Sequence, residues 1–404
     1  MSGVIIAAAA ARARLEPVHG VKAFRSNSSS AIASRAGQYL GMSAHALGPK
    51  ELAQAVHDDS RELGIPRVKA PGPDQRWADQ SILDRLTNRL TGASTDLFGR
   101  FNDGEYERDA AQRLWRNLSV AKDPDTLVAL LNLRQHSDHD LEAVAAAAGL
   151  AILSGGSLEL SNVVLKDFAE STDDLIRGIA SAIVRPPRPL PPPVVADTNT
   201  APYDTPVSTT IHGTWDLVTN NGWYEPRSDL HDHLRSTTKN LYDDEAYFIW
   251  SGEYSAAARA QGAADLYHWQ NIVSSAGWID TIYAHSHGGN VALDAAAAGQ
   301  RIKMLVLLHT PAIHRPDKEW KSINSNVQSV IAMRTRMDLV VLADSLMSRE
   351  ARQKFDGRKL PHFPITNTWA RREAWFSHSF FVDAQNWIDY KLAKKVKSRY
   401  RLIR

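Results

Sequence analysis

The stretch Ile279–Leu293 reads Ile-Asp-Thr-Ile-Tyr-Ala-His-Ser-His-Gly-Gly-Asn-Val-Ala-Leu. Its first part, up to Ala284, is a short run rich in β-favouring residues, which predicts a buried strand. From Asn290 onward apolar residues recur with helical spacing, so we expect a helix to begin near Gly289. Ser286 therefore lies on a tight turn that leads from a strand directly into a helix.

Strands alternate with helices along the whole second half of the chain. Strand-like runs occupy Val207–Ile211, Ala246–Trp250, Ile279–Ala284, Met304–Leu308 and Val327–Met333. Helical patterns cover Leu230–Leu241, Ser255–Ala276, Asn290–Ala298, Leu342–Lys354 and, at the end, Asp383–Leu392. This alternation is typical of an α/β fold with a mostly parallel sheet flanked by helices. We predict one such domain over residues 200–404.

The N-terminal half differs from this pattern. Residues 1–48 are rich in Ala, Ser and Gly, so we expect a flexible or partly helical segment. Residues 49–184 carry apolar residues at helical spacing and predict an all-α domain. Six of the nine residues from Arg185 to Pro193 are proline, which excludes a helix or a central strand. We interpret 185–199 as a stiff linker, although a ligand for proline-binding modules has the same composition.

Composition narrows the classes of protein. The chain has 404 residues, of which 43% are hydrophobic, which suits two folded domains. The formal net charge of +2 gives no reason to expect a nucleic-acid partner. There is no cysteine, which excludes disulfides, thiolate metal sites and a cysteine nucleophile. No apolar run approaches the ~20 residues of a membrane span, and no convincing signal peptide is present, so we expect synthesis in the cytoplasm.

Ser286 has the setting of a catalytic nucleophile. Some hydrolases place this serine on a strand-to-helix turn, with small residues two before and two after it, usually as Gly-x-Ser-x-Gly. Ala284 and Gly288 occupy the two small positions here. The N-terminus of the following helix would stabilise negative charge that develops beside the serine. The competing interpretation is a serine that only caps an ordinary helix.

An oxyanion hole requires two backbone N–H groups near the nucleophile. One comes from the residue after the serine, which is His287. The other comes from a loop after an earlier strand, and His212-Gly213 directly follows Val207–Ile211. The N–H of Thr214 or Trp215 is then the second donor. A simple turn with a structural histidine is the alternative.

The acid and base of a catalytic triad follow the serine in the order Ser, Asp, His. Asp338 comes after the fifth predicted strand and is our candidate for the acid, with Asp344 as the second choice. His378 stands shortly before the last predicted helix and is our candidate for the base. His362 is the second choice, because it precedes a proline-bearing loop.

Four segments together resemble bacterial α/β-hydrolase lipases and esterases, and also the lipase-type effectors that some bacteria deliver into competitors. They are Ile211–Trp215, Ile249–Gly252, Ala284–Asn290 and His378–Trp387. The resemblance covers about Val207 to Trp387 and does not reach the N-terminal half. It implies an α/β-hydrolase fold, export as an effector as one option, and a triad of Ser286, Asp338 and His378.

The resemblance also implies a substrate pocket. We expect His212 and Gly213 to border it, Trp250 to shape its floor, and Trp223 to contribute from the segment Trp215–Tyr242, which would act as a lid or an acyl-binding wall. The expected reaction is cleavage of a carboxylic ester, in particular a lipid ester, with no cofactor. We expect no metal, because His231, His233, His136 and His139 lack an acidic partner at ligand spacing.

Partners and alternative functions stay open at this point. Residues 391–404 contain seven basic residues and no acidic one, which suits an anionic membrane surface as well as a solvated helix end. An amidase or a small-ester hydrolase is the first alternative function. A non-catalytic protein that binds a partner through its helical N-terminal domain is the second.

Overall fold

The computed structural model describes residues 131–153, 159–185, 202–214, 222–348 and 351–403, apart from single gaps, together with Leu127 and parts of 32–43. Several predictions lie outside the described residues. These are most of the segment 1–48, residues 49–126 of the helical domain, residues 186–199 of the linker, and Trp215.

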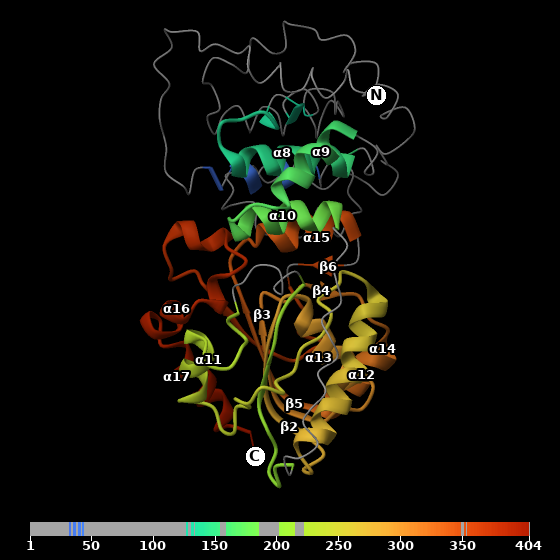
Figure 1. The fold of residues 1–404 in the computed structure, drawn as a ribbon, viewed down its shortest axis with the longest axis vertical. Helices are drawn as coiled ribbons and strands as arrows, with labels where there is room; N and C mark the ends of the chain where they lie inside the picture. Colours follow the sequence, from blue (N-terminus) through green and yellow to red (C-terminus); the bar gives the residue numbers. More distant parts are fainter. Residues whose placement is uncertain are drawn as a thin grey trace, which may run out of the picture.

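A parallel sheet of five strands forms the centre of the C-terminal half (Figure 1). Its strands lie in the order β1-β2-β3-β5-β7, and each neighbouring pair is parallel. Their bounds are Thr209–Ile211, Ile279–His285, Ile302–Leu308, Val327–Arg334 and Phe363–Thr366. The predicted α/β class is confirmed. In a parallel sheet the carboxyl ends of all strands lie at the same edge, so each connection between strands has to cross back over the sheet.

Helices cover both faces of this sheet (Figure 1). Side chains alternate along each strand, so Ile282 packs with one helical layer and Tyr283 with the other. The first layer contains α12 (Ala256–Val273), α13 (His287–Ala297) and α14 (Asp317–Asn326). The second contains α11 (Asp229–Arg235), α16 (Ala384–Asp389) and α17 (Leu392–Tyr400). The near-continuous apolar character of β2 and β3 follows from burial on both sides.

One predicted strand is wrong. Ala246–Trp250 joins no sheet, because Ala246 lies in a turn and the four residues after it have no regular secondary structure. Its backbone groups bond to side chains instead, since the Ala246 carbonyl accepts from Trp269 Nε1 at 2.7 Å and the Trp250 N–H donates to His212 Nε2 at 3.4 Å. The apolar residues of this segment therefore indicate that it is buried, and not that it pairs with another strand. The strand β7 was not predicted, because Pro364 interrupts a short run.

Three predicted helices have different bounds. The helix expected over Leu230–Leu241 ends at Arg235, where Ser236 and Thr237 hydroxyls bond to backbone carbonyls of the last turn. The helix expected from Leu342 is α15 (Leu339–Ser348), which begins directly after Asp338. The helix expected over Asp383–Leu392 is α16, which ends at Asp389, and a separate helix, α17, begins at Leu392 after the left-handed residue Lys391.

A layer of N-terminal helices lies against α15 (Figure 1). It consists of α8 (Asp140–Leu153), α9 (Glu159–Phe168) and α10 (Asp174–Val184). Gly178 of α10 lies so close to Val340 of α15 that an added Cβ would meet a Val340 methyl at 2.7 Å. These helices share one apolar core with α15, so they are packed on the C-terminal half rather than separated from it.

The remaining described elements are short. The strands β4 (Ala312–Ile313) and β6 (Ala351–Arg352) form an antiparallel pair. The 3-10 turns η3 (Arg372–Phe376) and η4 (Phe380–Val382) enclose His378. Within the described ranges, no helix combines the length and apolar character needed to cross a membrane.

Candidate active site

Ser286 lies between β2 and α13 with an unusual backbone conformation (φ 49°, ψ −131°). Positive φ is uncommon outside glycine and costs about 1–3 kcal/mol at such positions. The Ser286 N–H donates to the Leu308 carbonyl at 2.8 Å, which ties the turn to β3. Its hydroxyl does not cap α13 and has no hydrogen-bond partner in the described part of the chain. Oγ is therefore free to react, and the capping interpretation is wrong.

Close packing explains the small residues around this turn. A Cβ added to Gly288 would lie 2.2 Å from the His212 carbonyl oxygen, and one added to Gly289 would lie 2.1 Å from Thr310 Oγ1. Ala284 is fully buried and pairs with Ile211 of β1. The start of α13 is therefore pressed against the carboxyl ends of β1 and β3.

Two backbone N–H groups are free near Ser286. His287 is the first residue of α13, so its N–H has no partner within the helix. Thr214 donates no hydrogen bond to any described residue. Because Ile211 pairs with Ala284, the loop after β1 runs alongside the Ser286 turn. The role of His287 and Thr214 as oxyanion donors stays a prediction, and Trp215 lies outside the described residues.

His212 and Trp250 hold this loop in place. His212 Nε2 lies 3.1 Å from the Trp250 carbonyl oxygen, and Trp250 Nε1 donates to the His212 carbonyl at 2.8 Å. Their rings stack at 5.8 Å, and both side chains are buried. Trp223 is buried too, edge-on to His285 at 6.1 Å. These contacts give the three residues a structural role, and their contact with substrate, like that of Gly213, stays a prediction.

Asp338 and His378 are paired. His378 Nδ1 lies 2.7 Å from Asp338 Oδ2, and Asp338 Oδ1 accepts from the Val340 and Val341 N–H groups at 3.1 Å each. Burial favours a higher pKa for the Asp338 carboxyl, but His378 and the hydrogen bonds from His309 and His378 outweigh it and hold that pKa well below its ordinary range. Asp338 is therefore an anion that also caps α15.

Sequence reasoning missed a third group, His309. Its Nδ1 lies 3.0 Å from the same Asp338 oxygen, and its Nε2 accepts from the Phe381 N–H at 3.1 Å. This pattern requires the proton on Nδ1. Burial lowers the pKa of His309 to about 4, so the ring is neutral near pH 7. The sequence did contain a signal for this residue, because His309 directly follows β3 and so lies at the edge of the sheet where the site forms.

His378 lies beside His285, the residue that precedes Ser286. The His285 ring packs on the His378 ring at 4.8 Å, and His285 Nε2 lies 3.0 Å from the His378 carbonyl oxygen. Burial lowers the pKa of His287, and its hydrogen bond to Asp344 partly offsets this effect. No hydrogen bond joins Ser286 to His378 among the described contacts. Catalytic hydrogen bonds are often long without substrate and tighten when it binds.

The second choices for acid and base lie elsewhere. Asp344 Oδ2 lies 3.2 Å from His287 Nε2, and Asp344 Oδ1 accepts from the Tyr254 hydroxyl. It thus supports the residue that follows the nucleophile. His362 donates from Nδ1 to the Leu360 carbonyl at 2.7 Å and lines a separate cavity beyond β3. The structure brings Asp338 and His378 together. It does not bring Asp344 and His362 together.

The donor atoms of His309, Asp338 and His378 lie within 4.8 Å of one another, a spacing that a metal ion could also use. Both histidines, however, approach a single carboxylate oxygen at hydrogen-bond distance, and the Phe381 N–H keeps the His309 proton on Nδ1. A protonated nitrogen is not a metal ligand. The geometry fits proton-bearing donors better than an ion.

Comparison with known protein families, curated proteins and solved structures found no match to this chain. The resemblance to lipases and esterases therefore rests on the residues named above, and the function has to be argued from the geometry.

Proposed function

We propose that this protein is a serine hydrolase that cleaves carboxylic esters through an acyl-enzyme. The observation that carries the proposal is the free Ser286 hydroxyl on a strained turn, directly after His285, whose ring packs on that of His378. The His378 imidazole is hydrogen-bonded to the buried Asp338 anion. A positive-φ serine costs stability and persists where function requires it. The proposed fold is the α/β-hydrolase fold, which the parallel sheet and the strand–turn–helix at Ser286 support.

In the proposed mechanism His378 Nε2 removes the Ser286 Oγ proton as Oγ attacks the ester carbonyl. The Asp338 carboxylate accepts the Nδ1 hydrogen bond, orients the ring and stabilises its cationic form. The His287 and Thr214 N–H groups stabilise the oxyanion, each by about 3 kcal/mol. The imidazolium then protonates the leaving alcohol, and the acyl group stays on Oγ. A water molecule, deprotonated by His378, releases the acid and restores Ser286.

We propose lipid esters as the substrate class. On α17, Leu392 and Val396 are buried in the core, while Lys394 and Lys397 face outward and Leu402 beyond the helix is exposed. This segment therefore exposes both basic charge and an apolar side chain, which suits an anionic membrane. Export as an effector and a protein partner for the N-terminal helices stay predictions from the sequence.

Hydrolysis of aryl esters with increasing acyl length tests this proposal. We expect Ser286→Ala to lose roughly 10³-fold or more of kcat, and Ser325→Ala, an exposed serine on α14, to match the parent chain. Long acyl chains should give the higher kcat/KM. Preference for short chains or for amides would favour the alternative activities, and full activity of Ser286→Ala would contradict the proposal.

A further inference from the structure

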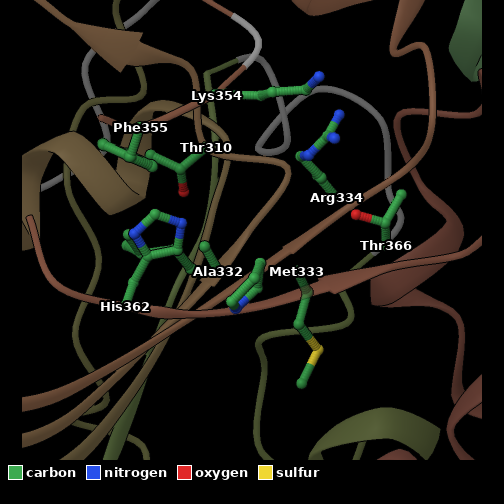
Figure 2. Close-up of a pocket in the computed structure, with 10 residues that line it drawn as sticks. Thr310, Ala332, Met333, Arg334, Lys354, Phe355, His362 and Thr366 are labelled. Carbon is green, nitrogen blue, oxygen red and sulfur yellow. The ribbon is translucent and has the colours of Figure 1, made fainter. Parts of the chain in front are cut away.

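A cavity of about 280 Å³ opens at the carboxyl ends of β3, β5 and β7 (Figure 2). Thr310 follows β3, Arg334 ends β5 and Thr366 ends β7. Lys354 and His362 approach from the segment that precedes β7. Ligands of parallel α/β sheets bind at this edge, because strand ends and loops converge there.

The polar groups that line this cavity can all donate hydrogen bonds to an anion. Arg334 and Lys354 are cationic, His362 is an imidazole, and Thr310 and Thr366 carry hydroxyls, while no described lining residue is acidic. Figure 2 shows Arg334 and Lys354 extending into the same part of the view, with Thr310 and His362 across from them. An arginine fork, a lysine point charge and hydroxyl donors are the groups that bind phosphate oxygens.

The cavity adjoins the Ser286 turn. Thr310 lines it, and the same side chain touches the backbone of Gly289, three residues after the nucleophile. Ser286 directly follows β2, the strand next to β3. Thr310 thus connects the cavity lining to the start of the helix that follows Ser286.

We propose that this cavity binds the phosphate group of the ester substrate. This inference rests on the proposed hydrolase function and narrows its substrates to esters that carry a phosphate. At about 280 Å³, the cavity is slightly smaller than typical ligand pockets of about 300–1,000 Å³, so it fits a head group and leaves the acyl chain outside. The Arg334 and Lys354 side chains supply the charge-assisted contacts, and the Thr310 and Thr366 hydroxyls complete the shell.

Binding is tested on the full chain with inorganic phosphate as the probe. Thermal unfolding is followed in rising phosphate, with chloride at matched ionic strength as reference. We expect phosphate to raise the unfolding midpoint of the parent chain, and Arg334→Gln/Lys354→Gln to lose this rise. Lys239→Gln/Arg301→Gln removes the same charge from exposed positions outside the cavity and should keep it. A rise that persists in the first variant overturns the proposal.

Kinetics separate a substrate phosphate from free phosphate. The substrates are short-chain acyl esters of glycerol and of glycerol phosphate with the same acyl group. We expect the pocket variant to raise KM about tenfold or more for the phosphate ester only, the scale of a lost charge-assisted bond. Because Arg334 Nη1 also bonds the Thr335 carbonyl, Lys354→Gln alone is measured too. Equal KM changes for both esters overturn the proposal, and so does phosphate binding without any change in selectivity.

The two proposals fail in different ways. If no ester is hydrolysed, the proposed hydrolase function fails, and the phosphate titration still decides whether the cavity binds an anion. If esters are hydrolysed and phosphate does not bind, the cavity assignment alone is wrong.

Discussion

His309 donates its Nδ1 hydrogen to Asp338 Oδ2, the same oxygen that accepts the hydrogen bond of His378. One buried carboxylate oxygen therefore holds two imidazoles, at 3.0 Å and 2.7 Å. The Phe381 N–H fixes the His309 tautomer from the other side. His309 is a positioning residue in this account, because it acts on the base through Asp338.

Removal of His309 should weaken catalysis more than binding. We expect His309→Ala to lower kcat about tenfold with little change in KM, the scale of an outer-shell partner. His309→Asn should restore most of this loss, because an amide N–H can reach Asp338 and Asn tolerates the positive φ of 53°. Steady-state kinetics on one aryl ester measures both. Wild-type kcat in both variants would contradict a positioning role.

The buried neutral His309 predicts a pH dependence of stability. Burial lowers its pKa from 6.5 to about 4, although Asp338 partly offsets this. Between these values the unfolded chain binds a proton that the folded chain does not. Stability is therefore complete above pH 6.5 and is lost as the pH falls toward 4, by about 3 kcal/mol.

Urea unfolding of the parent chain and of His309→Asn at pH 7 and pH 4.5 measures this loss. The Asn variant should lose less stability over this interval. The low pKa of Asp338 acts in the same direction only below pH 3.8, so its contribution falls outside this window. Equal losses in the two proteins would show that His309 is not the titrating group.

Much of this site could be predicted from the order of residues along the chain. The Ser286 turn was found because β2 and α13 have different apolar periods, and Asp338 and His378 because they follow it in the expected order. His309 was missed because only sheet topology places the end of β3 beside Asp338. The segment 246–250 was wrongly predicted as a strand, because an apolar run indicates burial, whichever groups form hydrogen bonds with its backbone.

Two aspartates compete for the role of the acid, and substitution should separate them. We expect Asp338→Asn to lower kcat roughly 10³-fold or more, because the amide cannot stabilise the imidazolium. Asp344→Asn should cost much less, since Asp344 contacts His287 and Tyr254 and not the base. Aryl-ester kinetics decides between them, and a larger loss in Asp344→Asn would reverse the assignment.

Gly288 should tolerate no side chain. An added Cβ would lie 2.2 Å from the His212 carbonyl oxygen, so Gly288→Ala must shift the turn or the loop after β1. We expect a loss of about 1–3 kcal/mol in stability and most of the activity. Gly357→Ala is the control, because its Cβ meets nothing within 4 Å. Denaturation and activity assays compare the two variants. If Gly288→Ala behaves like Gly357→Ala, this account is contradicted.

The central claim is that Ser286 is the nucleophile. Covalent labelling of the full chain with a fluorophosphonate probe, followed by mapping of the modified peptide, tests it most directly. We predict a single modification on Ser286, absent from Ser286→Ala and strongly slowed in His378→Ala. Labelling of another serine, or unchanged labelling of the Ser286→Ala variant, would contradict the account.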